Sequence, residues 1–116
     1  MKTTIKALDS NNEMYAEVMT NKAVNLVMPW VRTYMSWITT RPEDKVRIDI
    51  EWSFGSTHME ITNSDKWYLT YVEDEFFCDH ALEFDNRSEL RRFVRDILKN
   101  LEQADKAERA LRREWA

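Results

Sequence analysis

The chain has 116 residues, of which 43 % are hydrophobic and one is a cysteine, and its formal net charge at pH 7 is −4. This length suits a single domain spanning residues 1–116 and is too short for two, and the regularly spaced apolar residues exclude disorder. The lone cysteine excludes an internal disulfide and a zinc site built from cysteines, so we expect a reducing, cytoplasmic location.

The first predicted element is a helix that begins near Asn11. Ser10 and Glu13 have the Ser-x-x-Glu spacing of a capping box, in which each side chain bonds the other residue's backbone amide. Apolar residues largely at helical spacing follow, namely Met14, Val18, Val24, Val27, Val31, Tyr34 and Ile38. Pro29 lacks a backbone donor, so we expect it to kink this helix or to split it into two. The chain then turns over residues 39–44, before and around Pro42.

The middle of the chain predicts an antiparallel meander of three or four strands. The clearest strand alternates apolar and charged residues: Val46, Ile48, Ile50 and Trp52 against Arg47, Asp49 and Glu51. Gly55 is the only glycine and lies where a hairpin needs positive φ, before a second alternation at Met59 and Ile61. Residues 67–72 predict a third strand. Residues 76–84 form either a fourth strand or a loop.

A long helix is predicted for the C-terminal segment. Its cap is either Asn86 paired with Glu89, or Ser88 alone, and no Gly or Pro follows to end it. At 1.5 Å per residue it spans about 40 Å, so its last turns reach beyond a three-stranded sheet and need another partner. That partner is the N-terminal helix or a second copy of the chain, which leaves monomer and homodimer open. The predicted fold is α+β, with this helix packed on one sheet face.

Charge is unevenly distributed along the chain. Residues 41–86 contain 12 Asp or Glu against 4 Lys or Arg, whereas residues 87–116 contain 6 against 9. Strand alternation places several of these carboxylates on one sheet face and at its turns, beside aromatic residues. We therefore expect this acidic surface to bind a basic protein partner, such as a nuclease or a nucleic-acid-binding complex, by imitating phosphates. The predicted partner-binding residues are Asp49, Glu51, Glu60, Glu73, Asp74, Glu75, Asp79 and Phe76.

No catalytic or metal-binding signature stands out. Cys78, Asp79 and His80 lie close together, but a zinc site needs three or four ligands at known spacings and the only other histidine is His58. A buried structural cysteine and a surface histidine are the favoured interpretation. With one glycine there is no phosphate-cradling loop, so we expect no enzyme activity, catalytic residue, metal or cofactor.

A basic stripe along the C-terminal helix supplies the alternative function. Arg92, Arg95, Lys99, Lys106, Arg109 and Arg113 recur at intervals of three, four or seven residues. Such a stripe is typical of a nucleic-acid-binding ridge, but Glu102 interrupts it and the pI of the chain is near 5.2. A solvated helix face is therefore the favoured interpretation of the stripe. Direct nucleic-acid binding through it is the alternative function, after the acidic-surface inhibitor.

In size, acidity and lack of a catalytic signature, the chain resembles the small inhibitors carried by phages and mobile elements, and also toxin-immunity proteins. The resemblance implies a non-enzymatic inhibitor that neutralises a basic partner, and it assigns no residues. No stretch of the sequence has the length and apolar character of a membrane span, so no membrane partner is expected.

Overall fold

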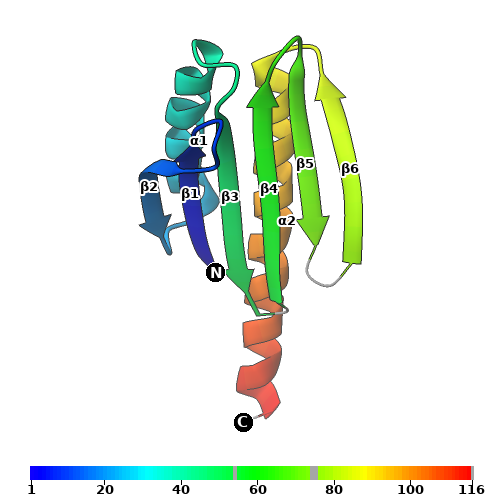
Figure 1. Ribbon diagram of the computed structural model, residues 1–116. Coiled ribbons are helices and arrows are strands. Elements are labelled where there is room, and N and C mark those ends of the chain that lie inside the picture. The colour runs from blue at the N-terminus through cyan, green and yellow to red at the C-terminus, as the bar shows by residue number, and fades with distance from the viewer. Residues whose placement is uncertain (54, 74–75, 116) are drawn as a thin grey trace.

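The computed structural model describes residues 1–53, 55–73 and 76–115, and at residues 72, 73, 76–80 and 115 it describes the backbone alone. These residues form an antiparallel sheet of six strands in the order β2-β1-β3-β4-β5-β6, with both helices behind it (Figure 1). The elements in chain order are β1 (Lys2–Leu8), β2 (Met14–Thr20), α1 (Val24–Thr39), β3 (Lys45–Trp52), β4 (Gly55–Asn63), β5 (Trp67–Glu73), β6 (Phe76–Phe84) and α2 (Arg87–Trp115). The α+β class is confirmed, with more strands than predicted.

The N-terminal segment is a β-hairpin, and the predicted helix start near Asn11 is wrong. Asp9 organises the turn, because its Oδ1 accepts hydrogen bonds from the amides of Asn11 and Glu13 at 2.9 and 3.0 Å. Asn12 has a φ of 60°, a left-handed conformation that Asn tolerates better than most residues. The supposed capping box is therefore an Asp-anchored turn.

The helix expected over this region is confined to α1, which begins at Val24. Pro29 lies inside it, and α1 nevertheless remains one element, so the predicted split is wrong. Its inner side contributes Val27, Val31 and Ile38 to the core, all at most 1 % exposed. This burial compensates for the single backbone hydrogen bond that Pro29 cannot donate.

The predicted strands from β3 to β5 are confirmed, and residues 76–84 form the sixth strand. Gly55 has a φ of 136°, as its place at the β3–β4 connection requires. The sequence predicted neither β1 nor β2; of these, β1 inserts beside β3 and pairs Lys6 with Arg47 and Thr4 with Asp49. The buried side of the sheet alternates with its open side along each of these strands.

One core lies between the sheet and the helices. α1 packs against β1, β3 and β4, while α2 packs against β5, β6 and α1. Fully buried side chains from all these layers meet there, among them Ile5, Ile48, Met59, Leu69, Val31 and Leu98. In the described part of the chain, no helix covers the opposite face of the sheet (Figure 1).

The start of α2 agrees with one of the two caps predicted from the sequence. The Oδ1 of Asn86 accepts a hydrogen bond from the amide of Glu89 at 3.0 Å, so Asn86 is the cap. The last turns of α2 project beyond the sheet, as its length predicted (Figure 1). Asp105 fixes the helix where it leaves the sheet, because it accepts hydrogen bonds from the amide and hydroxyl of Ser53 at 2.9 and 2.6 Å.

Candidate functional site

The centre of the predicted acidic face, on the open side of the sheet, contains cations as well as carboxylates. Asp49 lies on the open side of β3, where its carboxylate contacts Lys6 Nζ at 3.2 Å, Arg47 Nε at 2.9 Å and His58 Nδ1 at 2.6 Å. Partial burial of Asp49 opposes ionisation, but hydrogen bonds from His58, Arg47 and Lys6 hold its pKa below the ordinary value. Glu60 contacts Arg47 Nη1 at 3.4 Å and Lys45 Nζ at 4.0 Å.

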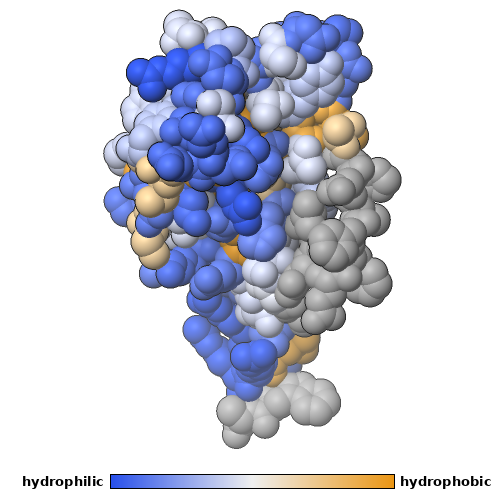
Figure 2. Space-filling model, in the orientation of Figure 1, coloured by the Kyte–Doolittle hydropathy of each residue, from blue (hydrophilic) through white to orange (hydrophobic). Residues whose placement is uncertain are grey.

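The remaining charges on this face also balance. Glu51 pairs in register with Lys2, and Lys6 with Glu17. Across the described strands β2, β1, β3 and β4, the open side carries four cations against four carboxylates: Lys2, Lys6, Lys45 and Arg47 against Glu17, Asp49, Glu51 and Glu60. Figure 2 shows this face, which is mostly hydrophilic. The structure brings Asp49, Glu51 and Glu60 to one face, as predicted, but surrounds them with cations.

The other predicted binding residues are described less fully. Glu73 ends β5, and Phe76 and Asp79 lie on β6, where only the backbone is described. Asp74 and Glu75 fall outside the described residues. Trp67, one of the aromatic residues near the acidic segment in the sequence, is 8 % exposed and belongs to the core.

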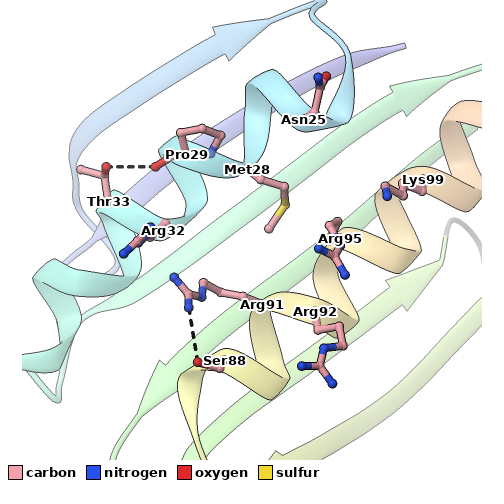
Figure 3. Close-up of a pocket in the computed structure, with 10 residues that line it drawn as sticks. All are labelled: Asn25, Met28, Pro29, Arg32, Thr33, Ser88, Arg91, Arg92, Arg95 and Lys99. Atoms are coloured by element: carbon pink, nitrogen blue, oxygen red, sulfur yellow. Dashed lines mark hydrogen bonds between the residues drawn. The ribbon is translucent and has the colours of Figure 1, made fainter.

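A cationic groove lies between α1 and α2 on the opposite side of the molecule (Figure 3). It has a volume of about 720 Å³. Five of its ten lining residues are basic, and none is acidic or aromatic: Asn25, Met28, Pro29, Arg32, Thr33, Ser88, Arg91, Arg92, Arg95 and Lys99. Met28 projects from α1 toward α2 in Figure 3. The groove thus has cationic walls and an apolar element between them.

The two walls come from antiparallel helices. The amide of Val24, at the start of α1, donates a hydrogen bond to Glu102 Oε2 of α2 at 2.9 Å. Glu102 therefore acts as the cap that Ala23, the N-cap residue of α1, does not supply from its own side chain. This contact explains why an acidic residue interrupts the basic stripe of α2, and it marks one end of the groove beyond Lys99.

Like charges crowd the centre of the groove. Arg32 of α1 and Arg91 of α2 extend toward one another in Figure 3. Partial burial, reinforced by the nearby guanidinium groups of Arg32 and Arg87, lowers the pKa of Arg91. Arg91 donates a hydrogen bond to Ser88 Oγ at 3.3 Å. An anion bound between these groups would relieve their mutual repulsion.

The predicted basic stripe divides into two parts. Lys106 contacts Glu102 at 3.5 Å and Arg109 contacts Asp105 at 3.3 Å, so these two cations are paired within α2. Arg92, Arg95 and Lys99 line the groove instead. Sequence reasoning found these three but missed Arg32 and Arg91, because the stripe was drawn along one helix and the groove needs two.

No metal centre is found within the described residues, where no group of three or more His, Cys, Asp and Glu side chains is placed to hold an ion. The side chains of Cys78 and His80 are outside the description, so their predicted structural roles stay predictions. Among the described residues, neither helix has the combination of length and apolar character needed to cross a membrane.

Comparison with known proteins gives no match to a family model, to a curated protein or to a solved structure. The groove geometry is therefore the ground for assigning a function.

Proposed function

We propose that the protein binds nucleic acid through the cationic groove between α1 and α2. Five basic side chains carry this proposal, around a groove that no carboxylate lines among the described residues. Arginine and lysine contacts to phosphates supply most of the affinity of sequence-independent nucleic-acid binding. The acidic net charge of the chain does not oppose such binding locally, because exposed charges farther away than a Debye length, about 8 Å at physiological salt, are screened.

The chemistry of the groove favours the backbone of the ligand over its bases. Arginine forks and lysine ammonium groups match phosphate oxygens. No aromatic side chain lines the groove, so base stacking on a ring is absent from it as described. We therefore expect binding that depends little on sequence and strongly on salt.

A double substitution on α2 tests the proposal. Arg95 and Lys99 are exposed and line the groove, so Arg95→Gln with Lys99→Gln removes two cations without disturbing the core. In fluorescence anisotropy with mixed-sequence oligonucleotides at about 50 mM salt, we expect affinity to fall about tenfold or more. The slope of log affinity against log salt should decrease by about 1.4 to 1.8.

The matched control lies on the same helix outside the groove. Lys106→Gln with Arg113→Gln makes the same change in charge at two other exposed positions, and we expect it to alter affinity by less than about threefold. Equal losses in the two variants would show that binding does not use the groove. No wild-type binding to DNA or RNA at low salt would refute the proposal outright.

The acidic-surface inhibitor hypothesis stays a prediction. Its described carboxylates Asp49 and Glu60 are paired with cations, and no side chain of its predicted residues between 73 and 79 is described. Reversal of Asp74 and Glu75 to Lys should slow association with a basic partner, and salt should weaken the wild-type complex steeply. The absence of enzyme activity likewise stays a prediction.

A further inference from the structure

The cations of the groove are divided between facing walls. Arg32 belongs to α1, whereas Arg91, Arg95 and Lys99 belong to α2. α1 and α2 are in contact, and the groove between them has a volume of about 720 Å³, so the space between its walls is small. A ligand that contacts Arg32 and Arg91 together must lie along this space. The groove thus selects an occupant about as wide as one extended chain.

The groove is also short. Its α2 wall runs from Ser88 to Lys99, which corresponds to about 16 Å along the helix axis. Glu102 lies just past Lys99 and caps α1 with its carboxylate at 2.9 Å from the Val24 nitrogen. Past that point Glu102, which Lys106 Nζ contacts at 3.5 Å, interrupts the row of cations that a polyanion would follow. The cationic contact therefore covers only a few phosphates.

The outer surface of α2 differs from its groove side. Glu89 and Asp96 are exposed on this helix and do not line the groove. Successive helical residues are about 100° apart, which places both carboxylates on the crest and on the flank away from α1. Asp96 is only weakly neutralised, since Arg95 Nε lies 4.0 Å from its Oδ1. A wide ligand resting across the crest would bring phosphates against these carboxylates as well as against Arg92, which extends away from α1 in Figure 3, so the crest attracts phosphates less than the groove does.

We infer that the ligand of the groove is single-stranded nucleic acid, held by its phosphates between the two helices. The inference rests on the proposed nucleic-acid binding and adds the strandedness of the ligand. Phosphates contact the arginines and lysine of both walls, while Met28 and Pro29 offer apolar surface to sugars and base faces. A duplex is too wide to enter a groove of about 720 Å³ between two contacting helices and would have to rest on the crest.

Anisotropy titrations with one labelled oligonucleotide, free or annealed to its complement, test this inference. We expect the single strand to bind about tenfold more tightly than the duplex at equal salt. Arg32→Gln on one wall and Arg95→Gln on the other should weaken single-strand binding to similar extents. The slope of log affinity against log salt should correspond to about 0.7 per phosphate contact, the value for single strands.

The outcomes of these titrations distinguish the single-strand inference from the proposal of nucleic-acid binding on which it rests. Equal or tighter duplex binding that is lost on Arg95→Gln with Lys99→Gln overturns the single-strand inference and leaves nucleic-acid binding standing. Failure of both oligonucleotides to bind at low salt overturns both. A polyglutamate peptide that binds through the same residues, while neither oligonucleotide binds, identifies an acidic protein segment as the ligand and likewise overturns both. Circular dichroism melts of each variant confirm that lost affinity is not lost folding.

Discussion

Asp105 illustrates how a single residue can connect distant parts of this fold. Its carboxylate accepts hydrogen bonds from the amide and hydroxyl of Ser53, contacts the α-amino group of Met1 at 3.1 Å, and pairs with Arg109 at 3.3 Å. Hydrogen bonds from Ser53 are the largest cause that lowers its pKa to about 2, although burial opposes them. A buried carboxylate remains charged at this position because its partners replace the water it has lost.

We expect Asp105→Asn to destabilise the protein in a pH-dependent way. The folded pKa of about 2 lies below the unfolded value near 3.8, so ionised Asp105 stabilises the folded state above about pH 4. That contribution is lost as pH falls through about 2. At pH 7 the variant should lose about 2 kcal/mol of unfolding free energy in urea denaturation.

The difference between wild type and Asp105→Asn should shrink as pH falls from about 4 to about 2. Asp96→Asn is the control, because Asp96 is exposed and its only described ion-pair contact is at 4.0 Å. A constant stability gap between wild type and Asp105→Asn over this pH range would contradict the assigned role of the charge.

At the scale of elements, side chains at the ends of the helices decide where each helix begins. Glu102 of α2 caps α1 across the groove, whereas Asn86 caps α2 locally. Asp9 plays a similar part in the turn before β2. Its carboxylate accepts hydrogen bonds from two backbone amides that would otherwise need a helix or water as partner. Polar side chains of similar type thus serve a helix start at Asn86 and a hairpin at Asp9.

The two caps predicted for α2 can be separated by substitution. Asn86→Ala removes the oxygen that accepts the Glu89 amide, and we expect it to cost about 1 kcal/mol in thermal or urea unfolding. Ser88→Ala should cost distinctly less, because the described contact of its hydroxyl is a 3.3 Å hydrogen bond from Arg91 at an exposed site. The reverse order of effects would move the cap to Ser88.

At the scale of the whole molecule, the two outer surfaces differ in charge. The open side of the sheet carries matched cations and carboxylates in its described part, whereas the helix side carries the cationic groove. The core and the helix layer separate these surfaces by more than a helix diameter, about 10 Å. At physiological salt this distance exceeds the Debye length of about 8 Å, so each surface should act on ligands independently.

This independence predicts the effect of substitutions on the sheet. Lys6→Gln with Arg47→Gln removes the same charge as the groove double variant, but on the opposite surface. We expect oligonucleotide affinity to stay within about threefold of wild type at 0.15 M salt. The melting temperature should fall modestly, because Asp49 loses two of its partners. A tenfold loss of affinity in the still-folded variant would instead attribute binding to the net charge of the molecule.

Much of the fold, and part of the candidate site, could be predicted from the sequence. Strict alternation in β3 and β4 identified both strands, and a cap at Asn86 or Ser88 followed by a segment without Gly or Pro identified the long helix. The N-terminal hairpin was missed because Met14 and Val18, four residues apart, fit a helix and a strand equally well. Local spacing alone does not distinguish the helical period from the strand period here. Contact of β1 with β3 makes the choice, since it buries Ile5 and Ala7.

The unpredicted strand β1 also changed the interpretation of the charges on the sheet. Alternation and helical spacing are local properties, so the sequence alone predicts the α+β class, the sheet-facing carboxylates and the cations of α2. The contact of Lys6 with Asp49 from a neighbouring strand, and the position of Arg32 opposite Arg91 across the groove (Figure 3), follow from the packing of the chain. Electrostatic surfaces depend on distances of a few ångströms between residues remote in the chain, and packing alone fixes those distances.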